Sequence, residues 1–244
     1  MRKTLISILI VLPFLAPAQP QRKTSYNDQV WFGDFSKLRL NEKWSIYFDF
    51  GLRRTEWLDK WSQTLVRPGI TRQLSPNVSV TAGAAWFNHY TTSVIRPEYR
   101  GWEQLLFSEV YGRVKVSHRL RAEQRFNQQV VKDELIDNYN YNSRYRYQLA
   151  LQVALNKPSI GDNTIYFLVS DEVMMNSGKE ITYNYFDQNR LAAGFGYKLN
   201  SAFGVTLSYM NVFIQKNAIA TYEKNNVLVI NLFHEFSRKD KKND

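Results

Sequence analysis

Hydrophobic and polar residues alternate along most of this chain. The clearest example is YNYNSRYRYQLALQVAL, residues 139–155, in which Tyr, Leu and Val fill most odd positions and Asn, Arg and Gln most even ones. Alternate residues of an extended strand point to opposite faces, whereas a helix would scatter the polar residues around its circumference. The pattern therefore predicts a β-strand with one apolar face and one polar face.

Eleven segments show this alternation. They lie near residues 28–40, 43–57, 60–73, 78–90, 100–116, 119–131, 139–155, 163–177, 186–199, 203–216 and 225–236. Each has about 12 to 17 residues, whereas strands of globular proteins usually have about 5 to 6, and a tilted strand crosses a bilayer with about 9 to 11. Alternation alone fits a soluble sandwich as well as a membrane barrel. The length of the segments favours an all-β fold, an antiparallel transmembrane β-barrel.

The expected number of strands comes from a general rule. Bacterial single-chain barrels normally have an even number of strands. We therefore expect 12 strands, or 10, although the alternation marks eleven segments. Either one segment has been missed or misassigned, or the stretch near 19–28 crosses first.

The connections between the segments predict an orientation. Links near 55–61, 88–100, 128–138, 177–186 and 214–225 are mostly longer and polar. The links at the other end are mostly short and contain Asn41, Asn77, His118 and Lys157. Outer-membrane barrels have short periplasmic turns and longer external loops, so we expect the first set outside and the second in the periplasm. Two aromatic girdles are expected from Trp44 at the periplasmic end and Trp57, Trp61, Trp86 and Trp102 at the other.

The N-terminus predicts export. Arg2 and Lys3 precede an apolar run from Leu5 to Leu15, and Ala16-Pro17-Ala18 supplies a small-x-small cleavage pattern, as in secretory signal peptides. A transmembrane helix would need about 20 apolar residues. We therefore expect a cleaved signal peptide at 1–18, a barrel at 19–236 and a charged tail at 237–244.

Composition narrows the classes of function. The chain has no cysteine, so it has no disulfide, thiol nucleophile or thiolate metal site. Its net charge is +10, but Lys and Arg are spread along alternating positions and form no single basic patch of the kind that binds nucleic acid. The three histidines, His89 in an expected external loop, His118 in an expected turn and His234, show no triad or metal-ligand spacing. We expect no enzyme activity, nucleic-acid partner, metal or cofactor.

Several motifs resemble those of one family in their order along the chain. They are DQVWFGDFSKLRLNEKWSIYFDFGLRR, LVRPGITRQLS, EYRGWEQLLF, HRLRAEQRF, NSRYRYQLAL and FDQNRLAAGFGYKLN. In these motifs the chain is similar to the DUF2490 family of outer-membrane proteins, common in Bacteroidota and other Gram-negative bacteria. The resemblance implies a barrel in the outer membrane of a Gram-negative bacterium and names no reaction. NLFHEF, ending at Phe236, resembles a barrel-assembly signal, so we expect outer-membrane lipid and the barrel assembly machinery as partners.

The polar faces of the segments are expected to line the barrel interior. In RLRAEQRF, residues 119–126, four charged residues occupy every second position. Each would cost about 2 to 4 kcal/mol if it faced the bilayer midplane. The expected interior charges are Arg119, Arg121, Glu123, Arg125, Arg144, Arg146, Glu172 and Arg190. Arginine outnumbers glutamate among them.

Two functions fit such an interior. A surplus of arginine favours small anionic solutes, which predicts a small passive pore or a ligand-binding barrel. Alternatively, Arg and Glu side chains fill the narrow interior and pair with one another. That arrangement predicts a plugged structural or interaction protein that acts through its external loops. We expect the first function and keep the second as the alternative.

Overall fold

The computed structural model describes residues 21–237, and its regular structure consists of β-strands. Eleven strands follow one another along the chain. They are β1 (Lys23–Arg39), β2 (Trp44–Thr55), β3 (Lys60–Ser75), β4 (Val78–Tyr90), β5 (Ile95–Tyr111), β6 (Val114–Val131), β7 (Glu134–Ala154), β8 (Thr164–Ser177), β9 (Phe186–Lys198), β10 (Phe203–Gln215) and β11 (Thr221–Ser237). None of the described residues forms a helix that is long and apolar enough to cross a membrane.

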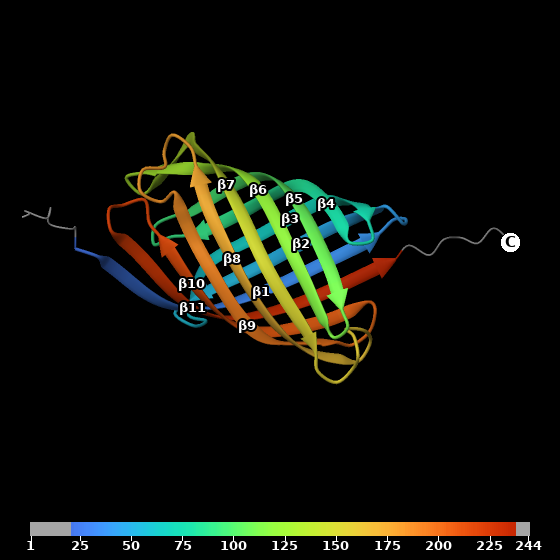
Figure 1. Cartoon of the computed structure of the whole chain (residues 1–244). Helices are drawn as coiled ribbons and strands as arrows, with labels where there is room; N and C mark the ends of the chain where they lie inside the picture. Colours follow the sequence, from blue (N-terminus) through green and yellow to red (C-terminus); the bar gives the residue numbers. More distant parts are fainter. Residues whose placement is uncertain (1–20, 238–244) are drawn as a thin grey trace, which may run out of the picture.

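The strands close into one barrel (Figure 1). Strands that are adjacent in the chain pair antiparallel, from β1 with β2 to β10 with β11. The closing pair, β1 with β11, is parallel and stays in register from Lys23 opposite Thr221 to Arg39 opposite Ser237. Closure leaves no free edge, so the wall has no row of unpaired backbone groups. The two ends of the described chain therefore lie at opposite ends of the barrel.

The expected strand number of 12 or 10 is wrong, because the described barrel has eleven strands. An even number is required only if every neighbouring pair, including the closing one, is antiparallel. Here β1 and β11 run in the same direction, and an odd number of strands closes the sheet. The predicted signal peptide at 1–18 and residues 238–244 of the predicted tail lie outside the described residues.

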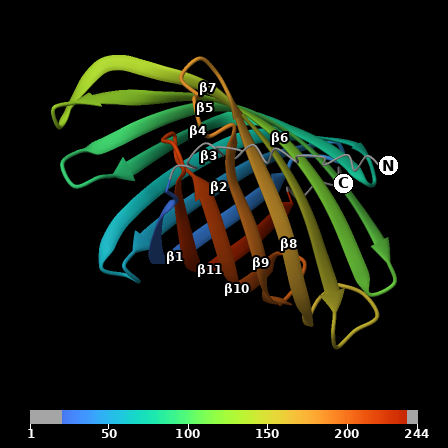
Figure 2. The ribbon, with the colours of Figure 1, turned by 60° about the vertical axis from the view of Figure 1, so that its left-hand side comes forward.

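Each of the eleven predicted segments corresponds to a strand, but several strands are longer than the alternation marks. β5 begins at Ile95 and not near residue 100, and β7 begins at Glu134 and not near 139. The β6–β7 hairpin ends in a two-residue turn of Lys132 and Asp133, both with positive φ, as the right-handed twist of a hairpin favours. Figure 2 shows this hairpin projecting from the barrel rim.

The expected contrast between long and short connections is wrong. At the end expected to be external, residues 91–94 and 132–133 are sufficient to join their strands, while residues 155–163 join β7 to β8 at the opposite end. The polar stretches that resembled loops continue the strands instead. The orientation of the barrel therefore stays a prediction.

The two faces of the wall differ as the alternation predicts. Large apolar side chains, such as those of Phe48, Leu120 and Leu191, are exposed on the outside, while polar side chains on the alternate positions are buried inside. Exposed tryptophans near the ends of strands match the expected girdles; they are Trp44, Trp57, Trp61 and Trp86.

The expected place of Trp102 in an outer girdle is wrong. Its side chain lies inside the barrel near the middle of β5, and it is 1% exposed. Its Nε1 donates a hydrogen bond to the carbonyl oxygen of Ala84 at 3.1 Å. Gly83 leaves space for the indole, because a Cβ at that position would lie 3.0 Å from Trp102 Nε1 and 2.2 Å from the Pro68 carbonyl oxygen.

Candidate functional site in the barrel interior

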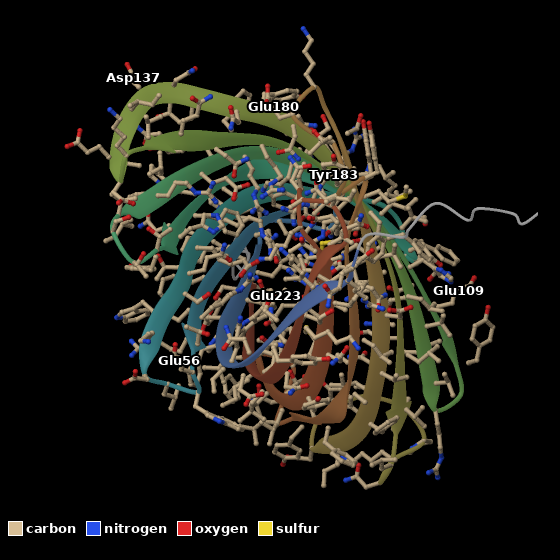
Figure 3. The ribbon with its side chains drawn as sticks, turned by 90° about the vertical axis from the view of Figure 1, so that its left-hand side faces the viewer. Glu56, Glu109, Asp137, Glu180, Tyr183 and Glu223 are labelled. Carbon is tan, nitrogen blue, oxygen red and sulfur yellow. The ribbon has the colours of Figure 1, made fainter. Side chains whose placement is uncertain are left out.

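The structure places all eight predicted interior charges on the inner face of one part of the wall. β6 carries four of them, β7 two, and β8 and β9 one each. Neighbouring strands bring them together, since Glu123 on β6 is opposite Arg144 on β7, and Glu172 on β8 is opposite Arg190 on β9. Figure 3 views the barrel from the end at which Glu56 and Asp137 lie, and side chains crowd the space inside the ribbon.

Glu123 is a centre of this network. It is 1% exposed and accepts hydrogen bonds from Arg146 Nη1 at 2.7 Å and from Arg100 Nη1 at 3.0 Å. Arg144 and Arg121 lie 3.8 and 3.9 Å from its carboxylate oxygens. Four arginines from three strands therefore share one buried carboxylate, which connects β5, β6 and β7 across the inner surface.

Glu172 is a second centre. Arg146 donates two hydrogen bonds to it, Nε to Oε1 and Nη2 to Oε2, each at 2.9 Å. Arg119 Nη2 donates to Oε1 at 2.7 Å, and Arg190 Nη1 lies 4.0 Å from Oε2. Arg146 bridges the two centres, because its remaining Nη1 reaches Glu123. Bidentate arginine–carboxylate contacts of this kind fix geometry as well as charge.

Glu98 is a third centre that the sequence analysis missed. It is fully buried, and it accepts hydrogen bonds from Arg125 Nε at 2.5 Å and Arg100 Nε at 2.7 Å. His89 Nε2 lies 2.6 Å from its other oxygen. The sequence predicts an external link near residues 88–100, whereas Glu98 lies in β5. The signal that could have found Glu98 is parity, since Glu98, Arg100 and Trp102 occupy alternate positions of EYRGWEQ.

The predicted places of two histidines are wrong. His89 lies in β4 and not in an external loop, and Gln63 Nε2 lies 3.0 Å from its Nδ1. His118 lies within β6 and not in a turn, with its Nδ1 2.9 Å from the Tyr147 hydroxyl. The strands simply extend further than their apolar residues suggest. Within residues 21–237, no group of three or more His, Asp or Glu side chains is placed to hold a metal ion.

Asp187 is also part of the interior, and a bulge puts it there. The register between β8 and β9 shifts between Met174 and Met175, so Asp187 is an extra residue beside Gln188. Both side chains are buried on the inside. An extra residue of this kind redirects side chains locally. Asp187 Oδ2 lies 3.3 Å from Arg144 Nε and gives that arginine a second carboxylate neighbour.

A separate set of charges lies on the part of the wall nearer the β1–β11 closure. Arg67 on β3 makes a buried ion pair with Asp49 on β2, and its guanidinium lies 5.6 Å from the centroid of the Trp102 ring. Arg53, also on β2, lies over the ring of Trp31 at 3.8 Å. Arg190 approaches the same ring at 5.0 Å. Trp31 thus brings the guanidinium groups of Arg53 and Arg190 close to each other.

Arg53 differs from the other eight arginines that line the interior cavity. Among residues 21–237, no side chain or carbonyl group accepts a hydrogen bond from it, and no carboxylate lies within 4.0 Å of it. It belongs to the lining of the interior cavity. Its guanidinium therefore lines the cavity with no hydrogen-bond acceptor among the described residues.

The interior cavity has a volume of about 940 Å³. Its lining includes residues near both ends of the barrel, such as Lys216 beyond β10 and Asn200 between β9 and β10. Nine arginines contribute to this lining: Arg53, Arg67, Arg100, Arg119, Arg121, Arg125, Arg144, Arg146 and Arg190. Five carboxylates pair with arginines of this set: Asp49, Glu98, Glu123, Glu172 and Asp187. Positive charge is therefore in excess around the cavity.

The chain is similar to a solved structure and to a protein family. A NanC porin is similar in structure, with a TM-score of 0.44 and 11% sequence identity over 78% of this chain and 89% of that chain. No curated protein matches the sequence. The model of the family described as "Protein of unknown function (DUF2490)" matches residues 28–223. Because this match spans most of the chain, the protein belongs to the DUF2490 family.

Proposed function

We propose that this protein is an outer-membrane β-barrel whose basic interior binds small anions or lets them pass. The wall supports the membrane location. Its strands have between 12 and 21 residues, more than the about 9 to 11 that a tilted bilayer crossing needs. Apolar side chains predominate on the outside, and the buried charged side chains lie inside. A soluble sandwich would have the reverse arrangement, with its apolar faces buried.

The proposed anion preference rests on one observation, the absence of a carboxylate partner for Arg53 among the described residues. This arginine lines the cavity and has no carboxylate partner among the described residues. Arg53 and Arg190 both lie near the ring of Trp31, at 3.8 and 5.0 Å from its centroid. An interior of low dielectric strengthens the attraction between such a cation and an anion. Arginine-lined constrictions select anions for the same reason. We therefore assign anion binding to the region around Arg53, Trp31 and Arg190.

The network around Glu98, Glu123 and Glu172 has a different role in this proposal. Its arginines are already paired with carboxylates, and it connects β5 to β9. Each of its seven arginines has a carboxylate within 4.0 Å, and four carboxylates serve them: Glu98, Glu123, Glu172 and Asp187. We assign this network, apart from Arg190, to holding the wall together and not to solute recognition. The alternation of the sequence does not separate these two groups of arginines, whereas their contacts do.

Planar-bilayer conductance under a salt gradient tests the proposal. The wild-type protein should give a reversal potential that favours anions over cations. Arg53→Gln should weaken this preference, because it removes a cavity-lining arginine that has no carboxylate partner among the described residues. Arg39→Gln is the matched control, since Arg39 is exposed at the end of β1 and pairs with Glu235 there; it should leave the preference unchanged.

The alternative is a barrel that does not conduct and acts through its loops. The compensated network supports it, because paired side chains occupy much of the interior. Two results would favour this alternative: absence of conductance by the folded wild-type protein, together with no protection against thermal unfolding by small anions such as phosphate or acetate. A protein that binds anions without conducting them would still show that protection, and Arg53→Gln should reduce it.

A further inference from the structure

The outer surface of the barrel carries a groove that is separate from the interior site. Its volume is about 850 Å³, and it extends over β2 to β8. Two adjacent rows of outward-facing residues line it, one of which begins with Trp44 opposite Arg72. The other contains Ala82 opposite Glu103, and Glu103 opposite Ala122. The groove therefore runs across the strands and not along them.

Small side chains make the floor of this groove. Ala82 on β4 and Ala122 on β6 take positions at which neighbouring strands carry larger residues, such as Tyr145 on β7. The larger side chains stand on either side, because side chains project roughly perpendicular to a sheet. The result is a depression in the apolar surface, which a flexible hydrocarbon chain can fill better than a flat rigid surface can.

Glu103 faces the same surface, but its carboxylate does not point along the groove. Gln124 Nε2 donates a hydrogen bond to Glu103 Oε2 at 3.1 Å. Gln124 is not among the residues that line the groove. The carboxylate is therefore directed toward the side, and the methylene groups of Glu103 form part of the lining.

Arg72 stands at one end of the groove. It is exposed, and its guanidinium lies 5.5 Å from the centroid of the Trp44 ring. Trp44 is the first residue of β2, directly after the turn at 40–43. Such a position is typical of interfacial tryptophans. Among residues 21–237, Arg72 forms no hydrogen bond or ion pair through its side chain.

Another outward arginine shows what is distinctive about Arg72. Arg54 lies over the ring of Trp61 at 4.3 Å near the other end of the barrel. Its guanidinium donates hydrogen bonds to the carbonyl oxygens of Leu58 and Asp59, at 2.7 and 2.9 Å from Nη2. Arg54 is thus satisfied within its own loop. Arg72 also lies near a tryptophan ring, that of Trp44. Unlike Arg54, its guanidinium donates no hydrogen bond to any residue of 21–237, and it lies at one end of the groove.

We propose that this groove binds one phospholipid, with its phosphate on Arg72 and an acyl chain over Ala82 and Ala122. A guanidinium matches phosphate through two parallel hydrogen bonds, and Arg72 lies where the head groups of a bilayer meet the apolar belt. The predicted orientation puts this end in the inner leaflet, which consists of phospholipids. The proposal rests on the membrane location proposed above, but not on the chemistry of the interior.

Native mass spectrometry of the purified full-length protein tests this site, with palmitoyl-oleoyl phosphatidylglycerol as the probe. The wild-type protein should retain one lipid molecule. Arg72→Gln should bind it about 10-fold or more weakly, because the loss of even one charged hydrogen bond to the phosphate has an effect of this size. Arg54→Gln is the matched control and should bind like the wild type.

A second variant tests the acyl chain separately from the phosphate. Ala82→Leu fills the floor of the groove and leaves Arg72 in place, so it should also weaken lipid retention. Heat-dependent gel mobility shows whether each variant is folded. Equal retention by wild type and folded Arg72→Gln would overturn the proposal, as would a second copy of the chain, or lipopolysaccharide, bound in place of the phospholipid. The conductance of the interior does not enter this test, so the two proposals can fail separately.

Discussion

At the scale of single residues, the interior depends on a few carboxylates that each serve several arginines. Glu123 is the clearest case, with Arg100 and Arg146 at hydrogen-bonding distance and both glutamate oxygens buried. Removing one partner of a buried ion pair costs about 3 to 5 kcal/mol, because the other charge remains buried without compensation. Glu123→Gln should therefore lower the free energy of unfolding by about this amount, measured by loss of the folded gel band in urea.

Glu56→Gln is the control for this substitution. Glu56 pairs with Lys60 at 2.9 Å on the surface, where both side chains are more than half exposed. Exposed ion pairs contribute about 0 to 1 kcal/mol, so the control should unfold almost like the wild type. If Glu123→Gln were no less stable than Glu56→Gln, the interior network would not be what holds these strands together.

At the scale of elements, the parallel closure of β1 on β11 is the feature that sets this barrel apart from an even-stranded one. Phe32 lies opposite Ile230 in this pair, and both are on the outward-facing parity. The chain has no cysteine of its own. A Phe32→Cys/Ile230→Cys variant should therefore form a disulfide, since partners in neighbouring strands lie within the Cα separation of about 4.4 to 6.8 Å that a disulfide needs.

The cross-link is measured as a mobility change of the boiled protein that disappears on reduction. The control pair, Phe32→Cys/Asn226→Cys, keeps one position but moves the other four residues along β11, which is out of reach of a disulfide. Cross-linking of the control and not of the registered pair would contradict the parallel register. Failure of both would indicate that β1 closes the barrel in another way.

The elements also show why part of this architecture could be predicted from sequence. Alternation depends only on neighbouring residues, so it identified all eleven strands and put Arg119, Arg146 and Glu172 on the inner face. The closure could not be found in this way, because it pairs the first strand with the last. Glu98 was missed because the start of β5 resembles a polar link, although Ile95 and Tyr99 alternate there with Arg96, Glu98 and Arg100.

At the scale of the whole molecule, the proposed membrane location leads to the question of which end of the barrel faces outward. The connections do not answer it, because 155–163 and 178–185 are long and lie at opposite ends. The predicted orientation puts 178–185 outside and 155–163 in the periplasm. Lys179 is exposed in the first connection and Lys157 is half-buried in the second. Asn217 is a poorer probe, because its side chain accepts hydrogen bonds from the backbone of Thr182 and Tyr183.

Single-cysteine variants distinguish the two orientations without background, since the wild-type chain has no thiol. In intact cells an impermeant maleimide should label Lys179→Cys and leave Lys157→Cys unlabelled until the outer membrane is opened. The reverse labelling pattern would show that the barrel has the opposite orientation in the membrane. It would also move Arg72 to the leaflet that faces the medium, where lipopolysaccharide replaces phospholipid. The orientation therefore decides which phosphate-bearing lipid Arg72 and Trp44 can meet, because both lie at the same end of the wall as residues 155–163.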